Sequence, residues 1–230
     1  MKDLLRHSAA EFVGTFALVF VGGGAIMMTR DTEPSAALLT VALAHGLILA
    51  LMVSATMRIS GHLNPAVTLG ILAARRISVL MAGVHIVAQL LGAVAAAYAL
   101  KHAMPAEAVL ATNLGGQKVA MSISTGQAFA LEAIATFFLV FVVFGTAVDP
   151  KGPKIGGLAI GLTVAADIMA IGPMTGASMN PARSFGPALM TGRFEGHLIY
   201  WLAPIAGAVI AGLLYDTLFL RGDDDAPAAT

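Results

Sequence analysis

Six long apolar blocks govern what this chain can fold into. They cover about residues 8–28, 36–57, 79–99, 126–147, 155–173 and 197–219. A helix needs roughly 20 mainly apolar residues to cross ~30 Å of hydrocarbon. A chain inside hydrocarbon must also satisfy its own backbone hydrogen bonds, which helices do within one segment. The sequence therefore predicts an all-α membrane protein with six transmembrane helices, forming one domain over residues 1–230.

Composition supports this prediction and excludes other classes. Only 11% of the residues are charged, whereas a soluble domain carries about 25%. The 13 basic and 13 acidic residues cancel, so no basic surface for nucleic acid is indicated. The chain has no cysteine, which excludes disulfides and thiolate metal sites. The methionines show no metal-binding pattern, and the sequence has neither a glycine-rich nucleotide loop nor a set of catalytic residues. We therefore expect that the protein binds no metal or cofactor and is not an enzyme.

Loop charges predict the orientation. With six spans both termini lie on one side of the membrane, and that side carries more basic residues, which is typical of the cytoplasmic face. We therefore expect a multi-pass protein of the cell (inner) membrane with both termini cytoplasmic, and a disordered tail at 221–230. The basic residues on the two sides are Lys2, Arg6, Arg75, Arg76, Lys151, Lys154 and Arg221 against Arg30, Lys101, Lys118 and Arg193.

The two halves of the chain resemble each other. The segment 11–20 matches 132–141, and 42–46 matches 157–161. Each half holds three predicted spans, so the second half must enter the membrane upside down relative to the first. The pattern predicts an inverted repeat, about 8–100 and 126–219, with a pathway at the repeat interface near the membrane midplane.

An Asn-Pro-Ala triplet occupies the equivalent position of each half. Asparagine is a favoured helix N-cap and proline a favoured first helical residue. The first helix would run from Pro65 to about Arg76, or ~18 Å, which is too short to span; the second would run from Pro181 to about Met190. We expect two re-entrant half-helices whose positive N-terminal ends meet at the midplane and repel cations and protons. The triplets are Asn64, Pro65, Ala66 and Asn180, Pro181, Ala182.

These motifs resemble the aquaporin (major intrinsic protein) family over about residues 8–219. The matching segments are 10–15, 59–68 and 176–187. The resemblance implies the aquaporin fold and a homotetramer in the lipid bilayer with one pore per protomer. Each pore would pass water and small neutral solutes while excluding protons and ions.

The resemblance also implies roles for individual residues. The selectivity filter would consist of His45, Ile168, Ala177 and Arg183. One residue is missing before His62 relative to the family pattern, and another placement of that gap would put Ala44 in the ring instead of His45. His62 would line the pore. The buried acids Glu11 and Glu132 would accept hydrogen bonds from the re-entrant loops.

The implied filter bears on the solute. At the position of Ile168, strict water channels have histidine. An apolar residue there resembles the tonoplast-intrinsic and ammonia-permeable branches of the family. We therefore expect water and also ammonia, urea or hydrogen peroxide to pass. A glycerol facilitator is one alternative, but Ser184 and Ala188 depart from its pattern. Two further alternatives are an ion-coupled secondary transporter and a role in membrane adhesion. Asp167, beside Ile168, would either cap a neighbouring backbone or tune the pore.

Overall fold

The computed structural model of the chain describes residues 2–220, and every regular element in that range is helical. The predicted tail at 221–230 lies outside the described residues. Six helical segments are long and apolar enough to cross a membrane, which confirms the predicted fold class. They are α1 (Lys2–Met28), α2 (Pro34–Thr56), α4 (Val79–Ala103), α6 (Thr125–Val143) with η2 (Phe144–Val148), α7 (Gly156–Thr175) and α9 (Ile199–Tyr215) with η3 (Asp216–Leu220).

Two short helices correspond to the predicted half-helices. α3 (Pro65–Ala73) and α8 (Pro181–Thr191) each begin at the proline of a triplet. A further short helix, α5 (Ala106–Thr112), and the 3₁₀ turn η1 (Asn113–Gly115) lie between α4 and α6. No sequence pattern described above predicted this pair.

The predicted end of α3 at about Arg76 is wrong, because the helix ends at Ala73. Arg75 adopts a left-handed backbone with φ of 60°. The Arg76 N–H then reaches back to the Ile71 carbonyl at 3.0 Å, and the Arg75 N–H to that of Leu72 at 2.9 Å. This is a Schellman motif, which normally places glycine in the left-handed position. Arginine there gave no sequence signal for the end.

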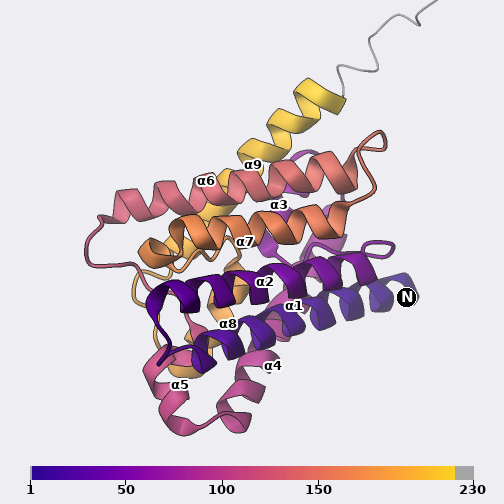
Figure 1. Ribbon diagram of the computed structural model, residues 1–230. Coiled ribbons are helices and arrows are strands. Elements are labelled where there is room, and N and C mark those ends of the chain that lie inside the picture. The colour runs from indigo at the N-terminus through magenta and orange to yellow at the C-terminus, as the bar shows by residue number, and fades with distance from the viewer. Residues whose placement is uncertain (1, 221–230) are drawn as a thin grey trace, which may run out of the picture.

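The long helices pack in pairs within and between the halves. α1 packs along α4 and α6 along α9, while α2 packs along α7 across the two halves; α1, α2, α7 and α6 lie one beside the next in Figure 1. The α2–α7 contact depends on glycine, because a Cβ placed on Gly46 would lie 2.6 Å from the Gly161 carbonyl oxygen. Small residues therefore allow close helix contact here.

The half-helices join the two halves together. α3, from the first half, packs against α9 of the second, and α8 packs against α4 of the first. Gly70 of α3 lies against the Ala208 backbone, and Gly186 of α8 against the Ala93 backbone. These contacts fix both half-helices between long helices of the other half.

Candidate functional site

A buried carboxylate holds the loop that leads into α3. Glu11 is 0% exposed and accepts hydrogen bonds from the backbone N–H groups of His62 at 2.9 Å and Leu63 at 2.7 Å. The Ser60 hydroxyl and the Gln89 amide, at 2.6 Å, also donate to it. Because an ionised group in hydrocarbon is costly unless it is satisfied, these four donors explain how the acid is accommodated.

Glu132 repeats this arrangement in front of α8. It is also 0% exposed and accepts hydrogen bonds from the N–H groups of Ser178 at 2.9 Å and Met179 at 2.8 Å. The Thr175 hydroxyl donates to it at 2.7 Å. The two acids thus hold equivalent loops in the two halves.

The residue before each asparagine adopts a strained conformation. Leu63 and Met179 both have φ of 51°, a left-handed region that side-chain-bearing residues rarely occupy. Their N–H groups are those bound by Glu11 and Glu132. The carboxylates therefore stabilise two matching strained turns, each of which costs ~1–3 kcal/mol.

The two triplet asparagines bind each other's loops. Asn64 caps α3 by accepting from the Ala66 N–H at 2.8 Å, and its amide donates to the Met179 carbonyl at 2.7 Å. Asn180 caps α8 by accepting from the Ala182 N–H at 3.0 Å, and its amide donates to the Leu63 carbonyl at 2.9 Å. An amide NH₂ has two hydrogens, so each asparagine keeps one donor for another partner.

Both asparagines line a narrow central cavity. The space open to the centres of water molecules in it is about 20 Å³, room for about one water at a time. One side of the lining is polar. The other is formed by Leu18, Leu49, Val67, Leu139, Val143, Ile160 and Val164.

The structure divides the predicted filter residues between two cavities. His45, Ala177 and Arg183 line the narrow cavity, whereas Ala44 is not among its lining residues. Ile168 lines a wider cavity of about 580 Å³, and Arg183 lines that cavity as well. The arginine therefore stands where the narrow and the wide spaces meet.

Arg183 and His45 are both held in place by backbone carbonyls. Arg183 is 5% exposed, and its Nη1 donates to the carbonyls of Gly176 and Ala177 at 3.3 Å each. His45 Nδ1 lies 2.8 Å from the Val41 carbonyl. That nitrogen must carry the hydrogen, because a carbonyl only accepts, and Nε2 is then an acceptor.

The Oδ2 atom of Asp167 takes neither of the two roles expected for this residue. Its buried Oδ2 has no hydrogen-bond partner within residues 2–220, and it lines neither the narrow nor the wide cavity. Capping of a neighbouring backbone, the favoured interpretation, is therefore not seen for that oxygen.

A third cavity opens at the end of the bundle where α1 begins. It has a volume of about 270 Å³ and is lined by His7, His62, His85 and Arg76, among others. His62 also lines the narrow cavity. Together the three cavities follow one path past both asparagines. His7 and His85 were not among the predicted site residues, because they lie far from the triplets in sequence.

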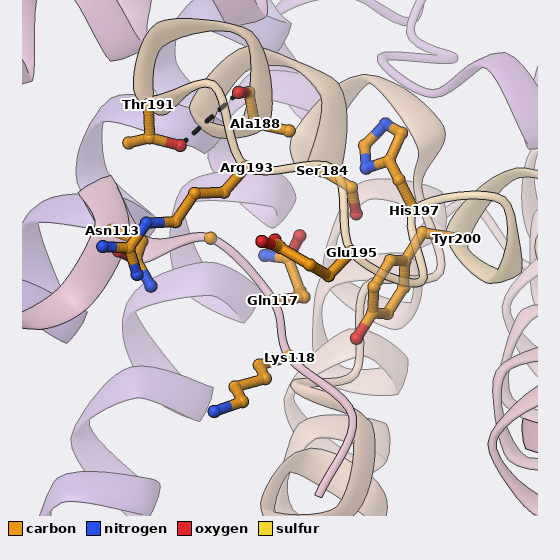
Figure 2. A pocket seen from close by; sticks show the side chains of 11 residues that line it. Asn113, Gln117, Lys118, Ser184, Ala188, Thr191, Arg193, Glu195, His197 and Tyr200 are labelled. Carbon is orange, nitrogen blue, oxygen red and sulfur yellow. Dashed lines mark hydrogen bonds between the residues drawn. The ribbon is translucent and has the colours of Figure 1, made fainter.

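A further hollow of about 280 Å³ lies beside the wide cavity. Gln117 and Lys118 line both spaces. Figure 2 shows Arg193, Glu195 and Lys118 around this hollow, with Tyr200 at one edge. Charged groups of both signs surround it, so this end of the path is polar.

Comparison with known proteins decides the family. The sequence pattern of the major intrinsic proteins matches residues 1–215. The chain belongs to the major intrinsic protein family. Aquaporin TIP2-1 of Arabidopsis thaliana is 41% identical over 235 residues, which cover 98% of this chain and 92% of the relative. Aquaporin TIP1-2 of Zea mays is 45% identical over 227 residues, with 95% and 87% covered.

The aquaporin fold is matched as well. The X-ray structure of the aquaglyceroporin from Plasmodium falciparum superimposes with a TM-score of 0.81 at 27% identity, covering 97% of this chain and all of that one. These relatives confirm the resemblance to aquaporins and to their tonoplast branch. The protein is a passive, multi-pass membrane channel, and the expectation that it is not an enzyme is confirmed by its aquaporin relatives.

Proposed function

We propose that this aquaporin conducts water, that it also passes ammonia, urea or hydrogen peroxide, and that it excludes protons and ions. The observation that carries the proposal is the narrow cavity with an N–H donor left on each of Asn64 and Asn180. A water oxygen between them accepts from both amides. Its own hydrogens then point away along the path, which breaks a proton-conducting chain.

Fixed positive charge adds to this barrier. α3 and α8 both begin at the narrow cavity, and a helix N-terminus carries roughly half a positive charge. Arg183 adds a full charge at the junction with the wide cavity. A cation on this path would lose its hydration beside positive groups, whereas a neutral molecule would not be repelled.

The solute range follows from the four filter residues His45, Ile168, Ala177 and Arg183. Ile168 and Ala177 are apolar, so they offer an entering solute no hydrogen bonds. Small neutral molecules with little hydration to lose are favoured by such a wall. His62, further along, would line the path on the side of the 270 Å³ cavity.

Flux measurements on purified protein in lipid vesicles test the proposal. The protein should speed osmotic shrinkage with a low activation energy, and an ammonia gradient should change internal pH faster than in empty vesicles. Arg183→Val should raise the proton leak. Unchanged shrinkage would overturn water conduction, and unchanged proton leak would overturn the role of Arg183.

The filter assignment has its own test. The double change His45→Phe and Ile168→His should reduce ammonia flux several-fold while water flux continues. Ala44→Phe serves as the matched control and should have the smaller effect on the ratio of the two fluxes. Equal ratios in all three proteins would show that the ring is assigned wrongly.

Glycerol is a second candidate solute, because the matched structure is an aquaglyceroporin. Ser184 and Ala188 argue against it. Urea and glycerol fluxes should therefore be compared in the same vesicles, where glycerol faster than urea would favour the facilitator. Saturable flux that depends on an ion gradient would point instead to a secondary transporter.

We further propose a homotetramer in the cell (inner) membrane with both termini in the cytoplasm. The family resemblance and the excess of basic loop residues on the side of the termini support this. Light scattering of the detergent-solubilised protein, corrected for detergent, should give four times 23.5 kDa. Membrane fractionation would reveal an internal membrane instead, and protease cleavage of the tail in sealed right-side-out vesicles would contradict the orientation.

A further inference from the structure

Three histidines from separate segments meet at the mouth of the path where α1 begins. His7 Nδ1 lies 3.1 Å from His85 Nε2, and His85 Nδ1 lies 3.3 Å from His62 Nδ1. His85 is 1% exposed. Glu11 Oε1 lies 3.9 Å from His85 Nδ1.

Hydrogen bonding assigns the protons in this cluster. Thr68 Oγ1 donates to the Asn64 carbonyl at 3.1 Å, so it faces His62 Nδ1, also at 3.1 Å, as an acceptor. His62 Nδ1 then carries a hydrogen. His85 Nδ1 must be the acceptor of the histidine pair, and the His85 hydrogen sits on Nε2, where it is donated to His7. A lone pair of His85 is thus directed at the centre of the cluster.

We propose that this cluster is a binding site for a divalent transition-metal cation of the Zn²⁺ type. The ligands are the Nδ1 atoms of His62 and His85 and the Oε1 atom of Glu11. One ligand atom from each of these three residues lies within 4.8 Å of the other two. Zn–N bonds of 2.0–2.1 Å at the tetrahedral angle place two nitrogens about 3.3 Å apart. The observed histidine spacing of 3.3 Å matches this, and 3.9 Å to the carboxylate requires only a small shift.

The surroundings of the three ligands suit a metal. Histidine bound to a metal commonly donates its other ring N–H to a neighbour, which fixes the ring, and His85 does so to His7. Gln89 and the Leu63 N–H hold Oε2 of Glu11. Oε1 keeps the His62 N–H as a donor and exchanges the Ser60 hydroxyl for the cation. For Nδ1 of His62 to bind a cation, the hydrogen there must move to Nε2, and the imidazole stays neutral.

Charge and access also permit binding. The ligand set supplies one negative charge and two neutral imidazoles. The nearby cation Arg76, which lines the same cavity, is paired with Asp216 at 2.6 Å. The cavity of about 270 Å³ gives an entry route and room for a water as fourth ligand.

A cation here would close the channel. His62 lines both the outer cavity and the narrow one, so a hydrated ion on its Nδ1 stands at the entrance to the single-file path. We infer that Zn²⁺ supplied from the side of the termini inhibits water flux. This consequence rests on the proposed water conduction, whereas the binding itself does not.

Direct binding tests the site. Purified protein should bind one Zn²⁺ per protomer by titration calorimetry. Co²⁺ should give the visible absorption of a low-symmetry, four-coordinate site. His85→Phe should abolish both signals, and His85→Gln guards against misfolding of the first variant. His102→Gln, which alters an exposed histidine of the same helix, should leave both unchanged.

The supporting histidine has a separate expectation. His7→Gln should weaken Zn²⁺ binding by about 10- to 100-fold, the usual effect of losing a partner behind a metal ligand. Binding retained in both His85 variants, or absent from the wild type, would overturn the site.

Flux tests the consequence independently. Zn²⁺ inside or outside the vesicles should lower water flux only from the side where His7 lies, relative to each variant's own zinc-free flux. Binding with no effect on a measurable flux would overturn the closure. Binding without any water flux at all would instead count against the proposed function and leave the site standing.

Discussion

Arg76 and Asp216 form an ion pair that ties the end of α3 to the end of the last helix. Arg76 Nη2 and Nε lie 2.6 and 2.8 Å from Asp216 Oδ1. The aspartate is 2% exposed and the arginine side chain 41% exposed. The pair therefore joins a half-helix of the first repeat to the final span of the second.

Asp216→Asn should lower the stability of the folded protein. The change keeps the size of the side chain but removes the charge, and hydrogen bonds to charged groups contribute ~1.5–3 kcal/mol. We expect a loss near the lower end of that range, because Arg76 can regain water. Thermal unfolding in detergent measures it. The control Asp3→Asn alters an exposed pair, 3.7 Å long, and equal unfolding temperatures for the two variants would contradict the prediction.

Gly161→Ala should disrupt the contact between α2 and α7. The new Cβ would lie 2.6 Å from that of Ala50 and closer still to the Gly46 carbonyl, and overpacking of this kind costs ~1–3 kcal/mol. The amount of monodisperse protein after heating reports the loss. Gly83→Ala is the matched control, since no atom lies within 4 Å of its Cβ. A control as damaged as Gly161→Ala would show that helix contact is not the cause.

Arg75→Gly should stabilise the protein, and Gly192→Ala should destabilise it. Both residues end a half-helix in the left-handed conformation, with φ of 60° and 70°. Such a backbone costs a side-chain-bearing residue ~1–2 kcal/mol and glycine little. The shift in unfolding temperature should thus have opposite signs in the two variants. Shifts of the same sign would refute this reading of the two caps.

Acid should loosen the segment before α9. His197 lies outside the spanning helix, and burial lowers its pKa below the usual 6.5. Its Nε2 accepts from the Trp201 indole at 3.1 Å, which only a neutral imidazole can do. Because the unfolded state binds the proton first, stability is complete above about pH 6.5 and is lost as pH falls through the folded pKa.

Fluorescence of Trp201, the only tryptophan, reports this change. Emission and unfolding temperature of the wild type should shift as pH is lowered from 7 to 5, and those of His197→Phe should shift less. An identical pH profile in the variant would assign the effect to other groups.

The sequence predicted the features that depend on local pattern. Apolar length located all six spans, and the proline of each triplet located the first residue of each half-helix. The predicted end of α8 at about Met190 lies within one residue of the observed end at Thr191, where Gly192 takes the left-handed position. Arg75 gave no comparable signal for the end of α3, because the left-handed position that it occupies is usually filled by glycine.

Features that combine residues far apart in the sequence could not be predicted from sequence patterns. The cluster of His7, His62 and His85 combines three segments with no characteristic spacing, and the sequence analysis accordingly expected no metal. Ile168 likewise lines a different cavity from His45 and Ala177. This separation depends on how the helices are placed in space. The roles of the filter residues remain predictions until flux is measured.

The crossed hydrogen bonds of the two asparagines bear on how the protein is made. The Asn64 amide makes its hydrogen bond only when the Met179 carbonyl is present, and the Asn180 amide only when the Leu63 carbonyl is present. An unpaired backbone group in hydrocarbon costs several kcal/mol. The first three spans leaving a ribosome therefore contain half of a pore wall and no finished path. Conduction begins only after the second half has inserted, so the growing chain never exposes the cell to an open leak.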